Sequence, residues 1–179
     1  MTHYVPPARI RVIAVALIEH PSSGALFVAE FADRDGRVFH RPCGGGVEFG
    51  ETAAQALQRE FDEEFGAAME VGDRFAALES IFEFNGAPCH EIVLVHRARF
   101  LDPAFHEDRR YPVRAAPHDT GVWRPLNGAD GIPLYPVGMA ALLSGSQVLS
   151  RPGPPSPFSR VARTARRGPG TSRLLDGRC

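Results

Sequence analysis

Hydrophobic residues near the start of the chain fall into two short runs, residues 11–19 and 25–31. Both runs are rich in β-branched or other apolar side chains, which favours strands. Residues 21–24 (Pro-Ser-Ser-Gly) separate the runs and are typical of a turn. The pattern therefore predicts a β-hairpin over residues 11–31.

A third short strand is expected over residues 38–41, after a turn at residues 33–36 (Asp-Arg-Asp-Gly). It leads into Pro42 and three consecutive glycines at residues 44–46. Glycine loses more conformational entropy on folding than other residues, so regular structure is expected to stop there.

The spacing of apolar residues becomes helical after residue 52. One face, spanning about 80° of arc at roughly 100° per residue, is apolar; it comprises Ala54, Leu57, Phe61 and Phe65. Thr52 and Gln55 have the spacing of a capping box, and Gly66 suits the end of a helix. The pattern predicts a helix that is buried along this face.

The rest of the chain suggests more strands and a long loop. Strands are expected over residues 75–84 and 89–100, joined by an Asn-Gly turn. Residues 102–119 are polar and aperiodic, which indicates a long loop, and long loops often cover sites. A last strand is expected at residues 122–124, and a short helix over residues 136–143 with proline in its first turn.

The composition indicates one domain followed by a tail. With 179 residues and 44% hydrophobic content, the chain is large enough for one core, expected over residues 1–145. Residues 146–179 are rich in Pro, Gly, Ser and Arg and are expected to be disordered. There is no apolar run of membrane-spanning length and no secretory pattern at the start, so a cytoplasmic protein without a membrane partner is expected. The cysteines, Cys43, Cys89 and Cys179, suggest free thiols.

The distribution of charge limits the chemistry. The chain contains no lysine, which excludes a P-loop lysine and Schiff-base catalysis. Residues 1–150 hold 13 Arg against 20 Asp and Glu, whereas residues 151–179 hold 7 Arg against one Asp. An acidic body repels a polyphosphate unless a cation lies between them, which is a first indication of a metal.

Three glutamates share one edge of the predicted helix. Glu60, Glu63 and Glu64 are spaced i, i+3, i+4 and therefore form one acidic strip, with Glu64 bordering the buried face. Such a strip is usually a solvated helix face. It can also bind a divalent cation, because carboxylate oxygens are the ligands that Mg²⁺ and Mn²⁺ prefer and a cation relieves the repulsion between them.

The segment around this strip favours the second interpretation. Residues 45–67, GGVEFGETAAQALQREFDEEFGA, resemble the signature of the Nudix hydrolase superfamily, G-x5-E-x7-R-E-U-x-E-E-x-G-U, where U is a bulky aliphatic or aromatic residue. The matching positions are Gly45, Glu51, Arg59, Glu60, Phe61, Glu63, Glu64 and Gly66. The last U position departs from the pattern, because Ala67 is small. Similarity to Nudix segments extends over about residues 9–143.

The resemblance implies a fold, a reaction and a set of site residues. The fold is a Nudix α/β/α sandwich with a mixed β-sheet between helices. The reaction is metal-dependent hydrolysis of a diphosphate linkage in a nucleoside diphosphate derivative, with Mg²⁺ or Mn²⁺ as cofactor. The implied metal ligands are Glu60, Glu63, Glu64 and the carbonyl of Gly44; Gly45, Glu51 and Arg59 have supporting roles, Glu51 and Arg59 as an ion pair.

Residues outside the signature are weaker candidates. Family members often add a further catalytic carboxylate, for which Glu91 is the first choice and Glu83 and Glu107 are alternatives; a glutamate at such a position is more often a surface residue. The remaining candidates are Arg97 and Arg99 for substrate phosphates and Trp123, Phe82 and Phe84 for base stacking, although an exposed strand face or core packing explains them as well. The histidines His90, His96, His106 and His118 lack zinc-ligand spacing.

Two other functions compete with hydrolysis. A Nudix fold can serve as a non-catalytic nucleotide sensor or regulator, which loss of signature carboxylates would mark, and none is lost here. An isoprenoid diphosphate isomerase would need a cysteine and glutamate centre that is not recognisable around Cys43 or Cys89. The expected partner is a small-molecule nucleotide or diphosphate, without specific nucleic-acid binding, and a homodimer is possible.

Overall fold

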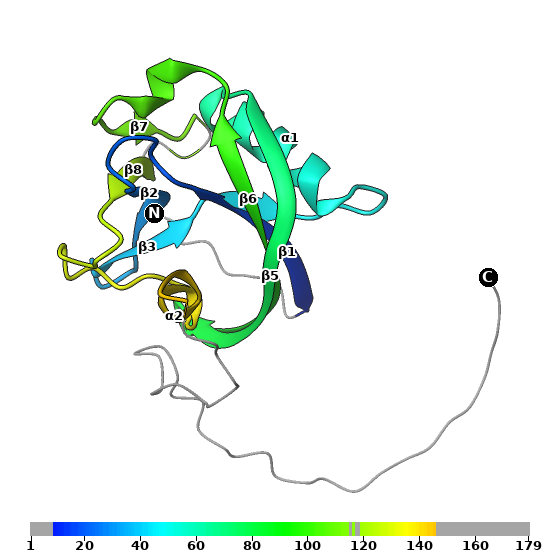
Figure 1. Cartoon of the computed structure of the whole chain (residues 1–179). Helices are drawn as coiled ribbons and strands as arrows, with labels where there is room; N and C mark the ends of the chain where they lie inside the picture. The colour runs from blue at the N-terminus through cyan, green and yellow to red at the C-terminus, as the bar shows by residue number, and fades with distance from the viewer. Residues whose placement is uncertain (1–8, 115, 117–118, 146–179) are drawn as a thin grey trace, which may run out of the picture.

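The computed structural model describes residues 9–114, 116 and 119–145, which form two β-sheets and two α-helices. Figure 1 shows their arrangement. The strands are β1 (Ile10–Ile18), β2 (Leu26–Ala32), β3 (Val38–Pro42), β4 (Gly44–Gly46), β5 (Met69–Phe84), β6 (Ala87–Phe100), β7 (Tyr111–Pro112) and β8 (Thr120–Arg124). The helices are α1 (Ala53–Phe65), α2 (Met139–Leu143) and a 3-10 turn, η1 (Pro103–His106). The tail predicted over residues 146–179 lies outside the described residues.

Each sheet has four strands. The first has the order β4-β1-β6-β5 and is mixed, because β1 and β6 run parallel whereas the other pairs are antiparallel. The second has the order β3-β2-β8-β7 and is antiparallel throughout. The predicted mixed α/β fold is confirmed, with this second sheet as an addition.

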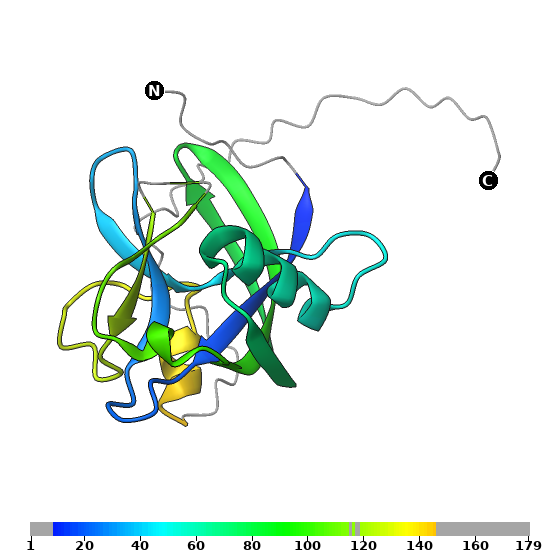
Figure 2. The same ribbon diagram turned by 90° about the horizontal axis from the view of Figure 1, so that it is seen from above.

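Strand β1 is buried on both faces and separates two hydrophobic clusters. Ala14, Ala16 and Ile18 pack in the cluster that contains Leu57 and Phe61 of α1. The alternate residues of β1, Ile13, Val15 and Leu17, pack in the cluster that contains Met139 of α2. The two helices therefore cover opposite faces of the mixed sheet, and α1 lies across it beside β1 and β4 (Figure 2). Neither helix is long and apolar enough to cross a membrane.

The predicted hairpin between the first two strands is wrong. Strands β1 and β2 lie in different sheets, and a single bridge between Glu19 and Leu26 joins them. Both edges of β1 are already paired, with β4 on one side and β6 on the other, so no edge is left for β2.

The glycine run does not interrupt regular structure, contrary to prediction, but forms strand β4. Gly44, Gly45 and Gly46 pair with Val15, Ala14 and Ile13. A Cβ atom on Gly44 would lie 2.1 Å from the carbonyl oxygen of Ala14, and its φ of 146° disfavours any side chain. The glycines thus permit a close backbone approach that residues with side chains prevent.

Helix α1 forms as predicted, with one correction to its buried face. Thr52 and Gln55 form the capping box, and Gly66 ends the helix with φ 64°. Ala56 is buried, whereas Ala54 is only half-buried. At roughly 100° per residue, the buried arc therefore extends past position 64 rather than ending beside it. This rotation brings the Glu64 side chain between the helix and the sheets.

The predicted hairpin of β5 and β6 is confirmed, and its turn residues Asn85 and Gly86 have φ of 53° and 85°. Strand β5 begins earlier than expected, at Met69, because bulges between Val71 and Ala76 let pairing continue. Helix α2 begins at Met139, after the expected first-turn proline, which leaves it shorter than predicted. The long loop contains η1 and β7.

A buried polar network joins β3 and β8 to the segment that follows β8. The Arg124 guanidinium donates to Nδ1 of His40 at 3.1 Å, so Nε2 of His40 carries the proton and faces Glu30 at 3.3 Å. Asp130 lies 3.5 Å from Nδ1 of His40 and 3.6 Å from Arg124. Burial lowers the pKa of His40, which outweighs the hydrogen bond to Glu30 that favours protonation.

The stability of the fold is therefore expected to decrease as the pH falls below about 6.5, the pKa of an unfolded histidine. Because the folded pKa of His40 is lower, the unfolded chain binds the proton more tightly in this range. Thermal unfolding measured from neutral pH downwards checks this. His40→Gln should reduce the dependence. His96→Gln, at a histidine on β6 whose Nδ1 lies 3.0 Å from the Gly72 carbonyl oxygen, should retain it. Equal dependence in both variants would contradict the assignment.

Candidate active site

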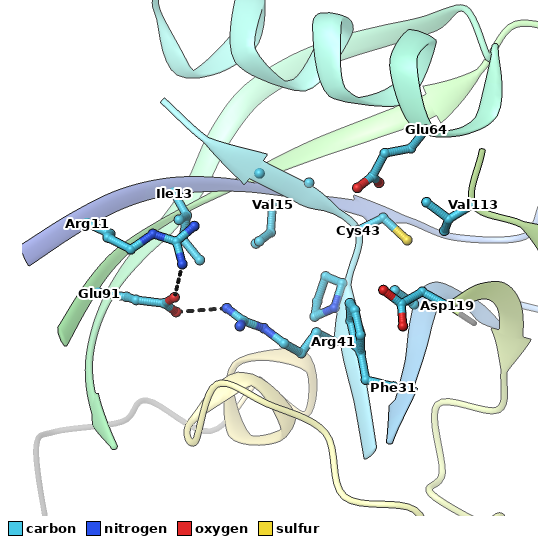
Figure 3. A pocket seen from close by; sticks show the side chains of 14 residues that line it. Arg11, Ile13, Val15, Phe31, Arg41, Cys43, Glu64, Glu91, Val113 and Asp119 are labelled. Atoms are coloured by element: carbon cyan, nitrogen blue, oxygen red, sulfur yellow. Dashed lines mark hydrogen bonds and ion pairs between the residues drawn. The ribbon is translucent and has the colours of Figure 1, made fainter. Parts of the chain in front are cut away.

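A cleft opens between the two sheets, beside the C-terminal part of α1 (Figure 3). Its two ends differ in charge. Glu64 of α1 and Asp119, which precedes β8, lie at one end, whereas Arg11, Arg41 and Glu91 lie at the other. The wall between them is mostly apolar and includes Ile13, Val15, Phe31, Pro42 and Val113.

Arg59 joins the signature loop to the helix. Its guanidinium donates to Glu51 at 2.8 Å and to the carbonyl of Gly46 at 2.9 Å. It also donates to Glu60 at 2.9 Å and to Glu63 at 3.3 Å. The hydrogen bond from Arg59 holds the pKa of Glu51 below its usual range. The expected pair of Glu51 and Arg59 is therefore present and fixes β4 against α1.

Glu60 lies directly over the backbone of Gly45. A Cβ atom on Gly45 would be 2.2 Å from the Glu60 carboxyl carbon, so no other residue leaves this carboxylate in place. Arg59 holds one of its oxygens. Gly45 thus provides the space that the carboxylate occupies beside β4.

Glu64 is the signature carboxylate that faces the cleft (Figure 3). Burial raises the pKa of Glu64 to about 7, and the negative charges of Glu60, Asp119 and Glu63 contribute to the shift. A nearby cation would reverse this effect, because it favours the charged carboxylate. The site therefore concentrates negative charge at the point where the helix meets the cleft.

The ladder between β4 and β1 determines the direction of the β4 carbonyl groups. The amide of Ala16 donates to the carbonyl of Cys43, and the amide of Val47 donates to the carbonyl of Val12. The hydrogen-bonded positions therefore fall at every second residue of this segment, with Gly45 between Cys43 and Val47. In an antiparallel ladder, the alternate residues Gly44 and Gly46 then turn their carbonyls away from β1. Gly46 shows this orientation, because its oxygen accepts from Arg59.

The donor set suits a hard divalent cation, although the side chains are not gathered around one point. Within the described residues, no three His, Cys, Asp or Glu side chains converge closely enough to hold a metal ion. Glu60 and Glu63 bind Arg59, and the Glu63 side chain is 59% exposed. All donors are oxygen atoms, and Glu64 has an excess of negative charge around it, as expected for Mg²⁺ or Mn²⁺.

The sequence model of the NUDIX domain matches residues 8–129 of the chain. This range includes strand β4 and helix α1, which carry the proposed metal ligands. The chain belongs to the NUDIX family. Membership agrees with the enzyme class predicted from the sequence, a hydrolase acting on diphosphate linkages. No curated protein matches the chain by sequence.

The chain is similar to several solved structures. The solution structure of the E. coli ORF135 protein is 26% identical, covers 76% of this chain and 87% of its own, and superposes with a TM-score of 0.51. The MutT protein from Methanosarcina mazei Go1 is 18% identical, with 81% and 96% coverage and a TM-score of 0.48. An ADP-ribose pyrophosphatase from Streptococcus suis 89-1591 is 15% identical, with 78% and 94% coverage and a TM-score of 0.45.

Among the carboxylates predicted outside the NUDIX signature, Glu91 lines the cleft and is only 3% exposed. Glu83 lies near the turn of the β5–β6 hairpin, and Glu107 is exposed and pairs with Arg109. Neither alternative belongs to the cleft.

The other secondary candidates lie away from the cleft. Arg97 covers the ring of Phe75, and Arg99 pairs with Glu70 on the exposed side of the hairpin. Trp123 donates its indole N–H to the carbonyl of Phe105 and packs in the core, which is its structural role. The structure therefore agrees with core packing for Trp123 and an exposed strand face for Arg99, the alternatives named for these candidates.

Three further cleft residues, Asp119, Arg11 and Arg41, have no pattern in the sequence that singles them out. Asp119 ends the loop that was predicted to cover a site, which was the only available signal. Cys43 also lines the cleft, and burial raises the pKa of its thiol well above the usual range. A thiol of this kind stays protonated at neutral pH.

Proposed function

We propose that the chain is a divalent-metal-dependent pyrophosphohydrolase that cleaves a diphosphate linkage in a nucleoside diphosphate derivative. The observation that carries the proposal is the position of Glu64, which faces the cleft from the same strip of α1 as Glu60 and Glu63. The glycine strand β4 lies beside this strip. The opposite end of the cleft carries arginines that suit an anionic substrate.

The metal ligands would be Glu60, Glu63, Glu64 and the carbonyl of Gly44. When bound, Mg²⁺ or Mn²⁺ supplies charge neutralisation for the phosphates and lowers the pKa of a coordinated water. Glu63 would have to turn from Arg59, which its exposure permits. The cost of this turn is small, because exposed ion pairs contribute about 0–1 kcal/mol.

The protein groups then orient the diphosphate and remove a proton from the attacking water. Arg59 and Glu51 hold the signature loop in place, and the apolar wall limits water in the cleft. The proton acceptor outside the signature was predicted as Glu91, and Asp119 is a second candidate. Both oxygens of Glu91 face arginines, whereas Asp119 acts electrostatically on Glu64.

The two candidates make different kinetic predictions. Loss of a general base typically lowers kcat by about 10²–10⁴-fold. If Asp119 is the acceptor, Asp119→Asn should have this effect on kcat, while Glu91→Gln should act mainly on KM. Steady-state kinetics of both variants decides between them, and the reverse pattern would assign the role to Glu91.

A substrate screen tests the proposed function directly. Purified protein should release phosphate or a nucleoside monophosphate from at least one member of a panel containing nucleoside triphosphates, ADP-ribose and dinucleoside polyphosphates. Release should require Mg²⁺ or Mn²⁺ and stop when a chelator is added. Absence of turnover across the panel with metal present would contradict the proposal and favour a nucleotide sensor.

Replacing Cys43 separates hydrolysis from isomerase chemistry. Hydrolysis by an activated water needs no thiol, so Cys43→Ala should retain activity within about tenfold, apart from the effect of a small cavity in the wall. Loss of activity in a Cys43→Ala protein that unfolds at the wild-type temperature would indicate a chemical role for the thiol. The cytoplasmic location and the homodimer remain predictions.

A further inference from the structure

The end of the cleft opposite Glu64 contains an ion cluster that connects the two sheets. Glu91 on β6 lies 3.5 Å from Arg11 on β1 and 2.8 Å from Arg41 on β3 (Figure 3). Each guanidinium faces a different carboxylate oxygen. Arg11 and Glu91 are also partners in the register of the mixed sheet, so the backbone fixes their separation.

The buried carboxylate of Glu91 needs one arginine to neutralise its charge, but two arginines contact it. The Glu91 side chain is 4% exposed, and a buried carboxylate is costly unless it is paired. One guanidinium is enough for this pairing. Buried ion pairs seldom stabilise a fold more than apolar residues of the same size, so stability alone does not explain the second contact.

The arginines remain accessible from the cleft. Their side chains are 27% exposed for Arg11 and 23% exposed for Arg41, and both line the cavity with Glu91. Guanidinium groups bind phosphate through two parallel hydrogen bonds, and Glu91 holds Arg41 in a fixed direction. The binding group is therefore ordered before a ligand arrives, which lowers the entropic cost of binding.

The two ends of the cleft carry opposite charges. Glu64 and Asp119 repel an anion in the absence of a cation, whereas the arginine end attracts one. The apolar wall between them keeps the two ends apart and leaves space for an uncharged part of a ligand. A molecule with two separated phosphate groups matches this distribution of charge.

We propose that Arg41 and Arg11 form a phosphate subsite that selects substrates carrying a second phosphate group away from the cleaved diphosphate, with Glu91 as the positioning residue. The proposal rests on the proposed function in one respect, which is that the substrate binds in this cleft. The subsite itself depends on the arginines alone, so it can be tested without turnover and without metal.

The test is a calorimetric titration of inorganic phosphate into the wild-type protein in the presence of a chelator. Arg41→Gln should weaken binding by about tenfold to a hundredfold, the usual effect of losing a charge-assisted pair of hydrogen bonds. Arg41→Lys, which keeps the charge but not the planar fork, should weaken it several-fold and serves if the glutamine variant does not fold. Arg99→Gln, on the exposed side of β6, is the matched control and should bind as the wild type does.

Two results would overturn the subsite: no phosphate binding by the wild type, or equal affinities in the wild type and the folded Arg41 variants. Failure of the proposed hydrolysis would look different. In that case the substrate screen would show no turnover with metal, while the phosphate titration would still separate Arg41→Gln from Arg99→Gln.

Discussion

Glu64→Gln is expected to lower hydrolysis by at least about 100-fold, more than is typical for loss of a residue that only supports a metal ligand. Glutamine keeps the shape of the side chain but removes the charge that a divalent cation needs. The melting temperature should stay the same or rise, because the charges of Glu60, Glu63 and Asp119 repel that of the half-buried Glu64, and the variant relieves that repulsion. Initial rates with Mg²⁺ and thermal unfolding without metal measure the two effects.

Asp62→Asn provides the control on the same helix. Asp62 is exposed on α1 and lies outside the cleft, so the same chemical change should leave the rate within about twofold. If Glu64→Gln retained the wild-type rate, the assignment of Glu64 as a metal ligand would be wrong. Equal losses in both variants would instead indicate a general effect of charge on α1.

Gly44→Ala is expected to destabilise the fold by roughly 2–4 kcal/mol, through backbone strain and overpacking. The new Cβ would lie 2.1 Å from the carbonyl oxygen of Ala14 and 2.9 Å from the Cα atom of Val15. Both are backbone atoms of the central strand β1 and cannot move aside cheaply. Chemical denaturation measures the change in the free energy of unfolding.

Gly46→Ala is the matched control in the same strand. No heavy atom lies within 4 Å of its Cβ position, and it is not among the glycines with positive φ. Its effect should be below about 1 kcal/mol and can be stabilising, because alanine reduces the entropy of the unfolded chain. Equal destabilisation by the two variants would show that β4 does not pair with β1 in this register.

Features encoded locally could be predicted from the sequence. Helix α1 has its apolar period, capping box and terminal glycine within a single stretch, and all three occur in the structure. The turn at Asn85 and Gly86 is similarly local. The NUDIX signature could be recognised for the same reason, because its residues lie within one loop and one helix.

Features that depend on distant partners could not be predicted. The edges of β1 are paired with residues 29 or more positions away in the chain, so its short-range pattern pointed wrongly to β2. The glycines of β4 form a strand only because β1 lies beside them. Asp119, Arg11 and Arg41 have ordinary sequence surroundings, and only the folded chain brings them to one cleft.

The most direct measurement is titration of Mn²⁺ into the wild-type protein and into Glu63→Gln/Glu64→Gln, with free Mn²⁺ followed by electron paramagnetic resonance. The acidic strip of α1 predicts saturable binding to the wild type and a loss of at least about tenfold in affinity in the double variant, with both proteins folded. Equal affinity in the two proteins would show that the strip does not hold the cation.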